Sequence, residues 1–297
     1  MKIPIITGET CSGKSDIAYH LSKLVPHGEL VNIDLRQIYR ETPIGTNRDS
    51  FPIHLTNICD ITENISPLQM KQLVEDSISK ILLKGHTPII VGGSLFYIDI
   101  LTGRIKLDNK SISIDKYSSI PLNVIQSITK LYIPDIEINN SDWMNRQRLL
   151  KRLLTWKKSG IVYNKADDKY VLFGTFLDDN ILKNRIDNRT ETMLNNGLIN
   201  EYIFLQNKYG ERAVNFLKNT IGYKEIFKEF NNLHISNGSF NNKTVEVFIK
   251  LKKNISTNTY RYAKRQLTWM KKNKDIVMIK SDNDIINIAL KIFQEIT

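Results

Sequence analysis

Residues 8–15 combine the side chains that hold phosphate groups, at the spacing that such a loop requires. The segment reads Gly-Glu-Thr-Cys-Ser-Gly-Lys-Ser. Gly8 and Gly13 give the backbone the freedom to turn successive N–H groups toward phosphate oxygens. Lys14 adds a cation, and the hydroxyl of Ser15 can bind Mg²⁺. The segment therefore predicts a di- or triphosphate held at the N-terminus of a helix, and it leaves the reaction open.

A carboxylate and a pair of glycines follow two other predicted strands. Asp34 comes directly after the apolar segment 30–33, and Gly92 and Gly93 come after the apolar segment 88–91. Open α/β sheets bind ligands at the carboxyl ends of their strands, so Asp34 should face the phosphate loop. There it could bind Mg²⁺, anchor a hydroxyl acceptor, act as a general base or cap a turn. The glycines replace the acidic residue of many nucleotide hydrolases, which disfavours a motor or switch ATPase and leaves a small-molecule kinase open.

Basic side chains recur at helical spacing late in the chain. Such a helix face suits the phosphate backbone of a nucleic acid, with aromatic rings for base stacking, although a solvated basic face has the same pattern. A second pair, Arg185 and Arg189, could return to the phosphate loop. The face on the last long helix comprises Arg261, Lys264, Arg265 and Thr268, next to Tyr260 and Trp269.

Strand and helix signals alternate over the first part of the chain. A well-marked helix begins at Ser66 with a capping box and ends at Gly85. This alternation indicates an α/β fold with a parallel sheet. The strands are predicted at 3–7, 30–33 and 88–91, with a first helix that ends at residue 24.

The pattern changes after Gly103. Clusters of Ser, Asp, Lys and Asn surround one helical stretch, 145–158, closed by Gly160, which predicts an inserted helical module. Residues 170–176 predict a returning strand, and everything after Asp178 is predicted to be helical, at 178–196, 220–230 and 244–272. The predicted fold class is therefore α/β: a P-loop parallel-sheet core with a mainly helical insertion and a helical C-terminal half. The predicted parts are 1–104, the first part of the P-loop core; 105–169, the helical insertion; and 170–297, the core completion and C-terminal helices.

Composition limits the class of protein. The chain has 297 residues, of which 41% are hydrophobic, enough for a substantial core. We see no apolar run of membrane-spanning length and no signal segment, so we expect a cytoplasmic enzyme without a membrane partner. We also expect a monomer. Cys11 and Cys59 cannot form a disulfide framework, and the scattered histidines argue against a metal cluster. Lys and Arg outnumber Asp and Glu by 42 to 31, a formal charge of +11, which is typical of a polyanion partner or of a basic solvated surface.

Taken together, these motifs resemble the tRNA dimethylallyltransferase family. The matching blocks follow one another in the family's order over nearly the whole chain. The last block is the most specific, because a phosphate loop alone occurs in many unrelated enzymes. The blocks are GETCSGKS at 8–15, DLRQIYR at 34–40, IGT at 44–46, VGGSLFY at 91–97, RIDNR at 185–189, IGYKE at 221–225 and RYAKRQLTW at 261–269.

The resemblance implies transfer of a dimethylallyl group from its diphosphate to N6 of the adenosine on the 3′ side of a tRNA anticodon. By the same resemblance, Asp34 is the general base on N6, and Thr10 with Arg185 supports the bridging oxygen of the leaving diphosphate. Gln37 corresponds to the family residue that hydrogen-bonds the flipped adenine. An allylic carbon releases diphosphate readily once the departing charge is neutralised, and a carboxylate helps a weakly nucleophilic aromatic amine as its proton leaves. The adenine must also be turned out of the base stack to reach the site, and this costs least free energy in a single-stranded loop.

The remaining roles are implied by position in the same motifs. The expected partners are dimethylallyl diphosphate and the anticodon stem-loop of tRNA, and the expected cofactor is Mg²⁺ bound by Ser15. The implied diphosphate-binding residues are Gly8, Glu9, Thr10, Cys11, Ser12, Gly13, Lys14 and Ser15. The implied tRNA-binding residues are Gln37, Tyr39, Thr46, Arg148, Arg261, Lys264, Arg265 and Gln266.

The sequence departs from the family pattern at a few positions. Ile53 stands where a histidine is usual, and Ser94-Leu95 stands where Thr-Gly is usual. In the middle segment only Asn145, Arg148 and the apolar residues after them echo the family. None of these changes affects the phosphate loop or the candidate base, so we expect catalysis to be retained.

Three alternative functions account for parts of the sequence. A small-metabolite kinase would leave the helical second half without a purpose, and a non-catalytic RNA-binding protein would give Asp34 and Gln37 none. The isopentenyltransferases that act on free adenylate resemble the first half of the chain and share the chemistry. The basic last helix and the net charge of +11 favour tRNA over free adenylate.

Overall fold

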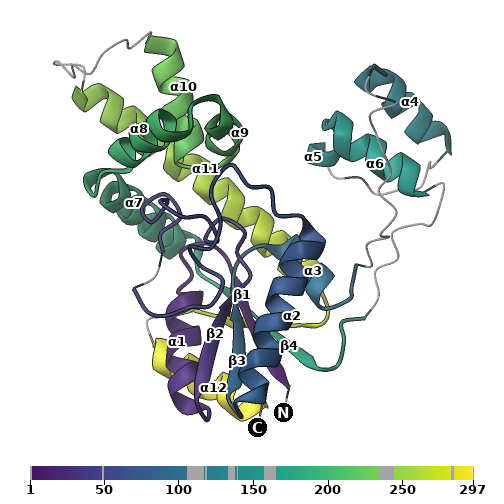
Figure 1. Cartoon of the computed structure of the whole chain (residues 1–297), viewed down its shortest axis with the longest axis vertical. Helices are drawn as coiled ribbons and strands as arrows, with labels where there is room; N and C mark the ends of the chain where they lie inside the picture. The colour runs from purple at the N-terminus through teal and green to yellow at the C-terminus, as the bar shows by residue number, and fades with distance from the viewer. Residues whose placement is uncertain are drawn as a thin grey trace. The chain divides into compact units, whose positions relative to one another are not determined.

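The computed structural model describes residues 2–48, 50–105, 117, 119–132, 138, 140–156, 165–233, 244–281 and 284–296 (Figure 1). The chain forms two compact units, which we describe separately. The larger unit comprises Met1–Leu101 and Ala166–Thr297, and the smaller comprises Thr102–Lys165. None of the described helices combines the length and the hydropathy that crossing a membrane requires.

The larger unit is a parallel sheet with helices. Its first part contains β1 (Ile3–Gly8), α1 (Lys14–Leu24), β2 (Gly28–Asn32), α2 (Pro67–Leu83), β3 (Thr87–Val91) and α3 (Leu95–Leu101). Its second part contains β4 (Tyr170–Phe176), α7 (Asp179–Asn195), α8 (Leu198–Tyr209), the 3₁₀ turn η2 (Gly210–Ala213), α9 (Val214–Asn219), α10 (Tyr223–Leu233), α11 (Thr244–Lys272), β5 (Ile276–Lys280) and α12 (Ile285–Ile296).

The strands lie in the order β2-β3-β1-β4-β5, and every pair is parallel. From β1 the chain passes to β2 and β3 on one side and later to β4 on the other, so the direction of winding reverses at β1. The carboxyl end of such a strand is the usual ligand site of an open α/β sheet. Here that end is the predicted phosphate loop.

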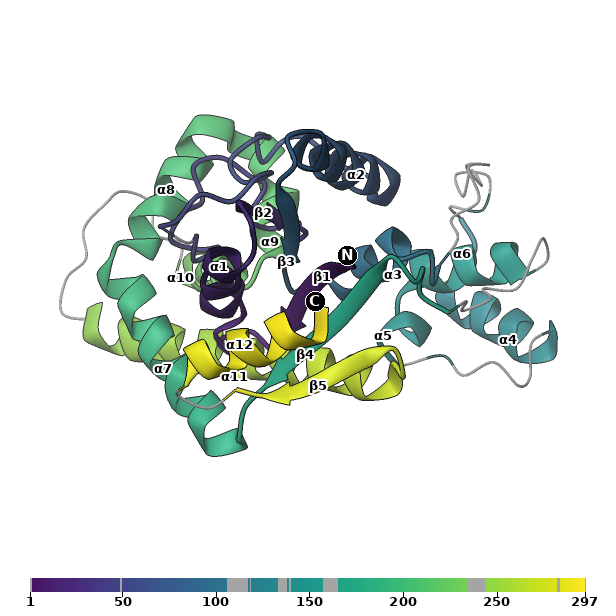
Figure 2. The same cartoon turned by 90° about the horizontal axis from the view of Figure 1, so that it is seen from below.

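Alternating side chains of the inner strands pack on opposite faces of the sheet. Ile5 of β1 belongs to one core cluster with residues of α2, α3 and α11, whereas Ile6 belongs to another with residues of α1 and α12. Strands buried on both faces read as continuous apolar runs, which explains why the first and third strands are plain in the sequence. Figures 1 and 2 show α1 and α12 side by side against the sheet.

Helices α7 to α11 gather at one end of the sheet, above it in the view of Figure 1. Contacts from α7 and α11 to the phosphate loop identify this end as the carboxyl end of β1. The second half of the larger unit therefore supplies side chains to the loop that the first half builds.

The smaller unit contains three described helices, α4 (Leu122–Tyr132), α5 (Asn140–Trp143) and α6 (Arg146–Trp156). Ile125, Leu149 and Leu150 form its buried apolar cluster. The guanidinium of Arg146 donates to the carbonyls of Ile120 and Tyr117 at 2.8 and 2.6 Å. The predicted end of the helix 145–158 and its closing residue Gly160 lie outside the described residues.

The predicted fold class is confirmed, with one correction to its elements. The capping box at Ser66 is present, and the helix predicted at 244–272 has those bounds. The prediction that everything after Asp178 is helical was wrong, because Ile276–Lys280 forms the edge strand β5 beside β4. Its hydrogen-bonding partner lies about a hundred residues earlier in the chain, so the local pattern does not reveal it.

Candidate functional site

The loop between β1 and α1 has the backbone of an anion site. Its φ angles are +66° at Cys11 and +83° at Gly13, which is the N-cap of α1. Left-handed residues in such a loop turn neighbouring N–H groups to one side, and the dipole of α1 favours negative charge at its N-terminus. The loop can therefore receive a phosphate group.

Residues distant in sequence hold this loop in place. The hydroxyls of Ser12 and Thr175 lie 2.6 Å apart, and Ser281 donates to the carbonyl of Ser12 at 2.7 Å. A Cβ at Gly8 would lie 2.0 Å from the Thr175 hydroxyl, so only glycine fits there. The Ser12 side chain thus supports the loop from within the protein, where it is fully buried.

Glu9 is also a buried part of the loop. One carboxylate oxygen accepts from the backbone N–H of Leu177 at 3.0 Å, and the other lies 3.8 Å from the ammonium of Lys264. Burial raises the pKa of Glu9, while the Leu177 N–H and Lys264 oppose that rise. Lys264 makes a closer ion pair with Asp179, at 2.6 Å.

Two arginines on α7 reach the loop from the other side. Arg189 donates to the hydroxyl of Thr10 at 2.9 Å, and Arg185 donates to the carbonyl of Cys11 at 3.5 Å. Arg189 also lies 3.4 Å from the sulfur of Cys11. The family resemblance pairs Thr10 with Arg185, whereas in the structure the hydroxyl of Thr10 accepts from Arg189.

Asp34 is braced by the residues around it. The side-chain amide of Asn32 bonds both the N–H and the carbonyl of Asp34, at 2.8 and 3.0 Å. One carboxylate oxygen of Asp34 accepts from the N–H of Arg36 at 3.0 Å, and the hydroxyl of Ser94 lies 3.4 Å from the same oxygen. Ser94 also accepts from the N–H of Leu35 at 3.2 Å, so the serine that departs from the family pattern still supports the Asp34 turn.

A second loop, 42–48, borders the site next to Gln37. The Gln37 amide lies 3.5 and 3.4 Å from the carbonyls of Thr46 and Asn47. The Glu201 carboxylate anchors this loop, because it accepts from the N–H groups of Ile44 and Gly45 at 2.9 and 2.8 Å. The loop therefore has a fixed position relative to helix α8.

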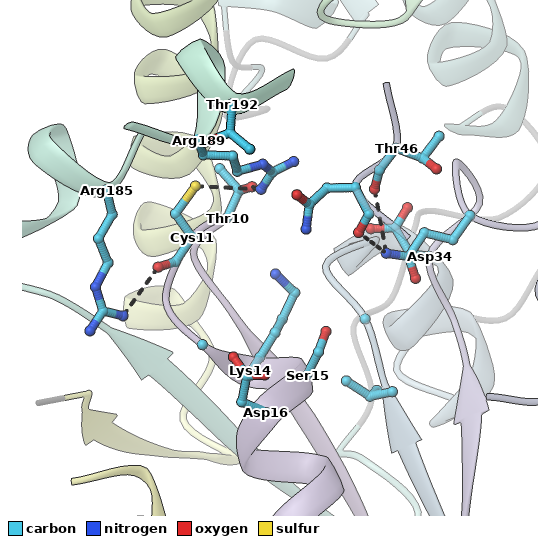
Figure 3. A pocket seen from close by; sticks show the side chains of 15 residues that line it. Thr10, Cys11, Lys14, Ser15, Asp16, Asp34, Thr46, Arg185, Arg189 and Thr192 are labelled. Atoms are coloured by element: carbon cyan, nitrogen blue, oxygen red, sulfur yellow. Dashed lines mark hydrogen bonds between the residues drawn. The ribbon is translucent and has the colours of Figure 1, made fainter. Parts of the chain in front are cut away.

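These elements enclose a cavity of about 410 Å³. Figure 3 shows Arg185 and Arg189 on one side, Asp34 and Thr46 on the other, and Lys14 extending between them from below. The cavity thus has a cationic side next to the phosphate loop and a polar, acidic side next to the second strand. Its lining residues are Thr10, Cys11, Gly13, Lys14, Ser15, Asp16, Asp34, Gln37, Thr46, Asn47, Val91, Gly92, Arg185, Arg189 and Thr192.

The structure brings only some of the predicted site residues to this cavity. Thr10, Cys11, Gly13, Lys14, Ser15, Asp34, Gln37, Thr46 and Arg185 line it. Gly8, Glu9 and Ser12 support the loop from behind. Tyr39 is 5% exposed and stacks edge-on against Phe216.

Only some of the predicted tRNA-binding residues of α11 are exposed to solvent. Arg261 and Arg265 are exposed. Lys264 turns toward Asp179, and Gln266 is 2% exposed inside the protein. Arg148, in the smaller unit, is exposed and pairs with Asp142 at 3.2 Å.

Sequence reasoning missed three polar residues that line the cavity, Asp16, Asn47 and Thr192. Arg189, one helical turn after Arg185, was expected to return to the phosphate loop, and it does line the cavity, but it was assigned no role there. Asp16 lies directly after the phosphate-loop motif. Asn47 and Thr192 have no comparable signal in one sequence.

A family model described as IPP transferase matches residues 37–273. The chain belongs to this family. A tRNA dimethylallyltransferase of Limosilactobacillus reuteri (strain DSM 20016) is 30% identical, with 92% of this chain and 91% of that protein aligned. The family resemblance predicted from the motifs is therefore confirmed, and the predicted activity agrees with the name of this relative.

Solved structures agree with this assignment. The full-length tRNA isopentenylpyrophosphate transferase of Bacillus halodurans is 25% identical with a TM-score of 0.68, and the match covers 99% of this chain and 96% of that one. A eukaryotic dimethylallyltransferase acting on tRNA has a TM-score of 0.73 at 22% identity, over 95% of this chain and 74% of that one, which supports the fold.

Proposed function

We propose that this chain transfers a dimethylallyl group from dimethylallyl diphosphate to N6 of the adenosine on the 3′ side of a tRNA anticodon. The observation that carries the proposal is the division of one cavity into a cationic phosphate-loop side and a side with a braced carboxylate. The first side suits a leaving diphosphate, and the second suits an amine that must lose a proton. The names of the relatives and the family match support the same reaction.

In the proposed reaction the allylic C–O bond breaks, the diphosphate leaves and a bond forms between N6 and the allylic carbon. Asp34 accepts the proton that N6 loses, as a positioned general base. Lys14 and the amides of Cys11, Gly13 and Ser15 hold the diphosphate. Gly8 and the amides of Glu9, Thr10 and Ser12, which donate to other parts of the protein, support the loop around it. Thr10 and Arg185 support the bridging oxygen of the diphosphate. We add Arg189 to this group, because it bonds the Thr10 hydroxyl and lines the cavity.

A divalent metal fits the phosphate end of the cavity. Ser15 and Asp16 offer oxygen ligands there, and Mg²⁺ in phosphate sites is usually held by one or two protein oxygens together with phosphate and water. We propose that the Ser15 hydroxyl binds Mg²⁺. When bound, the ion would neutralise charge on the leaving diphosphate.

The polar side of the cavity would receive the adenine. Gln37 and Thr46 line it, and Gln37 would hydrogen-bond the base. The buried Tyr39 would support this side through packing. Arg261 and Arg265, which are exposed, would contact RNA phosphates.

Several features of the proposal concern the protein as a whole. Arg148 would contact tRNA from the smaller unit, where its side chain is exposed. We propose that the protein acts as a monomer. An enzyme that modifies tRNA would work in the cytoplasm.

Product analysis tests this function directly. The protein is incubated with dimethylallyl diphosphate and Mg²⁺ and with either an unmodified tRNA or AMP, and the nucleosides are then identified by mass spectrometry. We expect N6-dimethylallyladenosine from tRNA only. Modification of AMP with unmodified tRNA left unchanged would replace the proposal with the free-adenylate reaction, and phosphoryl transfer from labelled ATP to a small acceptor would indicate a kinase.

A further inference from the structure

The side chain of Gln266 joins two separate loops of the active site. Its carbonyl oxygen accepts from the backbone N–H of Thr10 at 2.8 Å, and its NH₂ group donates to the backbone carbonyl of Gly93 at 3.0 Å. A side-chain amide carries an acceptor and a donor on one planar group, so the two bonds together fix its orientation. At 2% exposure, Gln266 is not accessible to RNA, in contrast to the role that the family resemblance implied.

The two loops carry opposite halves of the proposed reaction. The Thr10 hydroxyl lines the cavity and accepts from Arg189, at the leaving-group side. Gly93 precedes Ser94, whose hydroxyl lies 3.4 Å from the carboxylate of Asp34, the proposed general base. Gln266 therefore connects the two sides through a single residue on each.

The surroundings leave this bridge little freedom. A Cβ at Gly93 would lie 2.6 Å from the amide nitrogen of Gln266, so the two residues are in close contact. Tyr262, one turn earlier on α11, donates to the same Gly93 carbonyl at 3.2 Å. Lys264, on the same helix, approaches the buried Glu9 of the phosphate loop at 3.8 Å. One helix thus holds both loops.

We propose that Gln266 is a positioning residue that sets the separation between the diphosphate and the general base. This inference rests on the proposed function. The rate of a group transfer depends steeply on the alignment of the reacting atoms, and a misplacement of about 1 Å can slow it about 100-fold. Loss of the bridge should therefore slow transfer while both substrates still bind.

Misalignment also has a chemical signature. If the diphosphate departs while N6 is displaced, water can attack the allylic carbon instead, which gives dimethylallyl alcohol and releases a proton to solvent. The ratio of dimethylallyl alcohol to prenylated RNA then rises. A residue with only a structural role would lower both products together, through loss of folded enzyme.

Two substitutions test the bridge. Gln266→Glu keeps the acceptor for Thr10 but sets an oxygen against the Gly93 carbonyl, and Gln266→Met removes both hydrogen bonds at similar volume. We expect kcat for tRNA prenylation to fall about 10- to 100-fold with the KM of each substrate changed less than about threefold, and the alcohol fraction to rise. Gln206, which is exposed on α8, provides the matched controls Gln206→Glu and Gln206→Met.

The outcomes are distinguishable. A parent protein that does not prenylate tRNA refutes the proposed function. An active parent whose folded Gln266 variants keep kcat and the alcohol fraction overturns the role of Gln266, and so does a rise in tRNA Kd with kcat unchanged. Should the Gln266 variants not fold, Tyr262→Phe removes one hydrogen bond to Gly93 and should raise the alcohol fraction by a smaller amount, and an unchanged fraction again overturns the inference.

Discussion

Glu201→Gln should destabilise the larger unit and loosen the loop that borders the adenine side of the cavity. The Glu201 carboxylate is 9% exposed and accepts three hydrogen bonds, from the N–H groups of Ile44 and Gly45 and from the Tyr223 hydroxyl at 2.6 Å. Gly45 packs closely against Tyr223, because a Cβ at this position would lie 2.3 Å from the ring. The replacement keeps the shape and removes the charge.

The size of the effect follows from the hydrogen bonds. Glutamine offers one acceptor oxygen, so its NH₂ group must face at least one N–H donor that glutamate satisfied. Losing a charge-assisted hydrogen bond costs about 1.5–3 kcal/mol, and an unsatisfied buried donor costs about 1–3 kcal/mol. We expect a loss of about 3 kcal/mol. At about 2–4 °C per kcal/mol, the midpoint of thermal unfolding should fall by about 6–12 °C.

Circular dichroism melts of the variant and of Glu191→Gln provide the measurement. Glu191 receives the same substitution, but its side chain is 49% exposed and pairs with Lys252 on the surface, where a pair contributes about 0–1 kcal/mol. The reasoning is refuted if the two variants melt within about 2 °C of each other. Below its melting point, the Glu201 variant should also show a raised KM for tRNA, because Thr46 and Asn47 lie in the loosened loop.

Three further predictions concern charged groups. Asp34→Asn should slow single-turnover prenylation at saturating tRNA by about 10²- to 10⁴-fold without weakening binding, as rapid-quench assays can measure; a loss below about threefold would exclude Asp34 as the base. Arg265→Glu should reduce the slope of log K against log salt concentration by about one unit for binding to a fluorescent anticodon stem-loop, and should leave the midpoint of thermal unfolding unchanged. Lys264→Glu adds a negative charge beside a buried carboxylate, so it should lower that midpoint. Equal effects of the two variants on both measurements would contradict the distinction between Arg265, exposed to RNA, and Lys264, which supports the loop. Burial raises the pKa of Glu29, but hydrogen bonds from two histidine rings lower it more, to about 2, so its contribution to stability is present above about pH 4.5 and is lost as the pH falls toward 2. Glu29→Gln should therefore flatten the decline of the urea midpoint over that range, and a profile parallel to that of the parent would show that Glu29 contributes nothing to it.

Local sequence signals predicted the elements that are determined locally. The phosphate loop at 8–15 and the capping box at Ser66 are specified by neighbouring residues, and the helix at 244–272 by its own periodicity. The buried inner strands appear as apolar runs because both of their faces are covered. The edge strand β5 is short and depends on a partner far away in the sequence, so it was not predicted.

The orientation of side chains around the site could not be predicted in the same way. Helical spacing shows which residues share a face, but it does not show which face points inward. Lys264 and Gln266 turn toward the phosphate loop, whereas Arg265 between them is exposed. Similarly, the spacing of Arg185 and Arg189 placed both on α7, but the docking of that helix decides that Arg189 contacts Thr10.

The way the phosphate loop is held has a consequence for synthesis of the protein on the ribosome. The loop is made among the first residues, yet its supports from Thr175, Arg189, Gln266 and Ser281 are separated from their partners by 163, 179, 256 and 269 residues. A nascent chain therefore carries the complete motif long before it has the distant residues that hold the loop in place. Until Ser281 has left the exit tunnel, the emerging polypeptide should be unable to retain a diphosphate, and a truncated product of translation should be inert even though every residue of the motif is present.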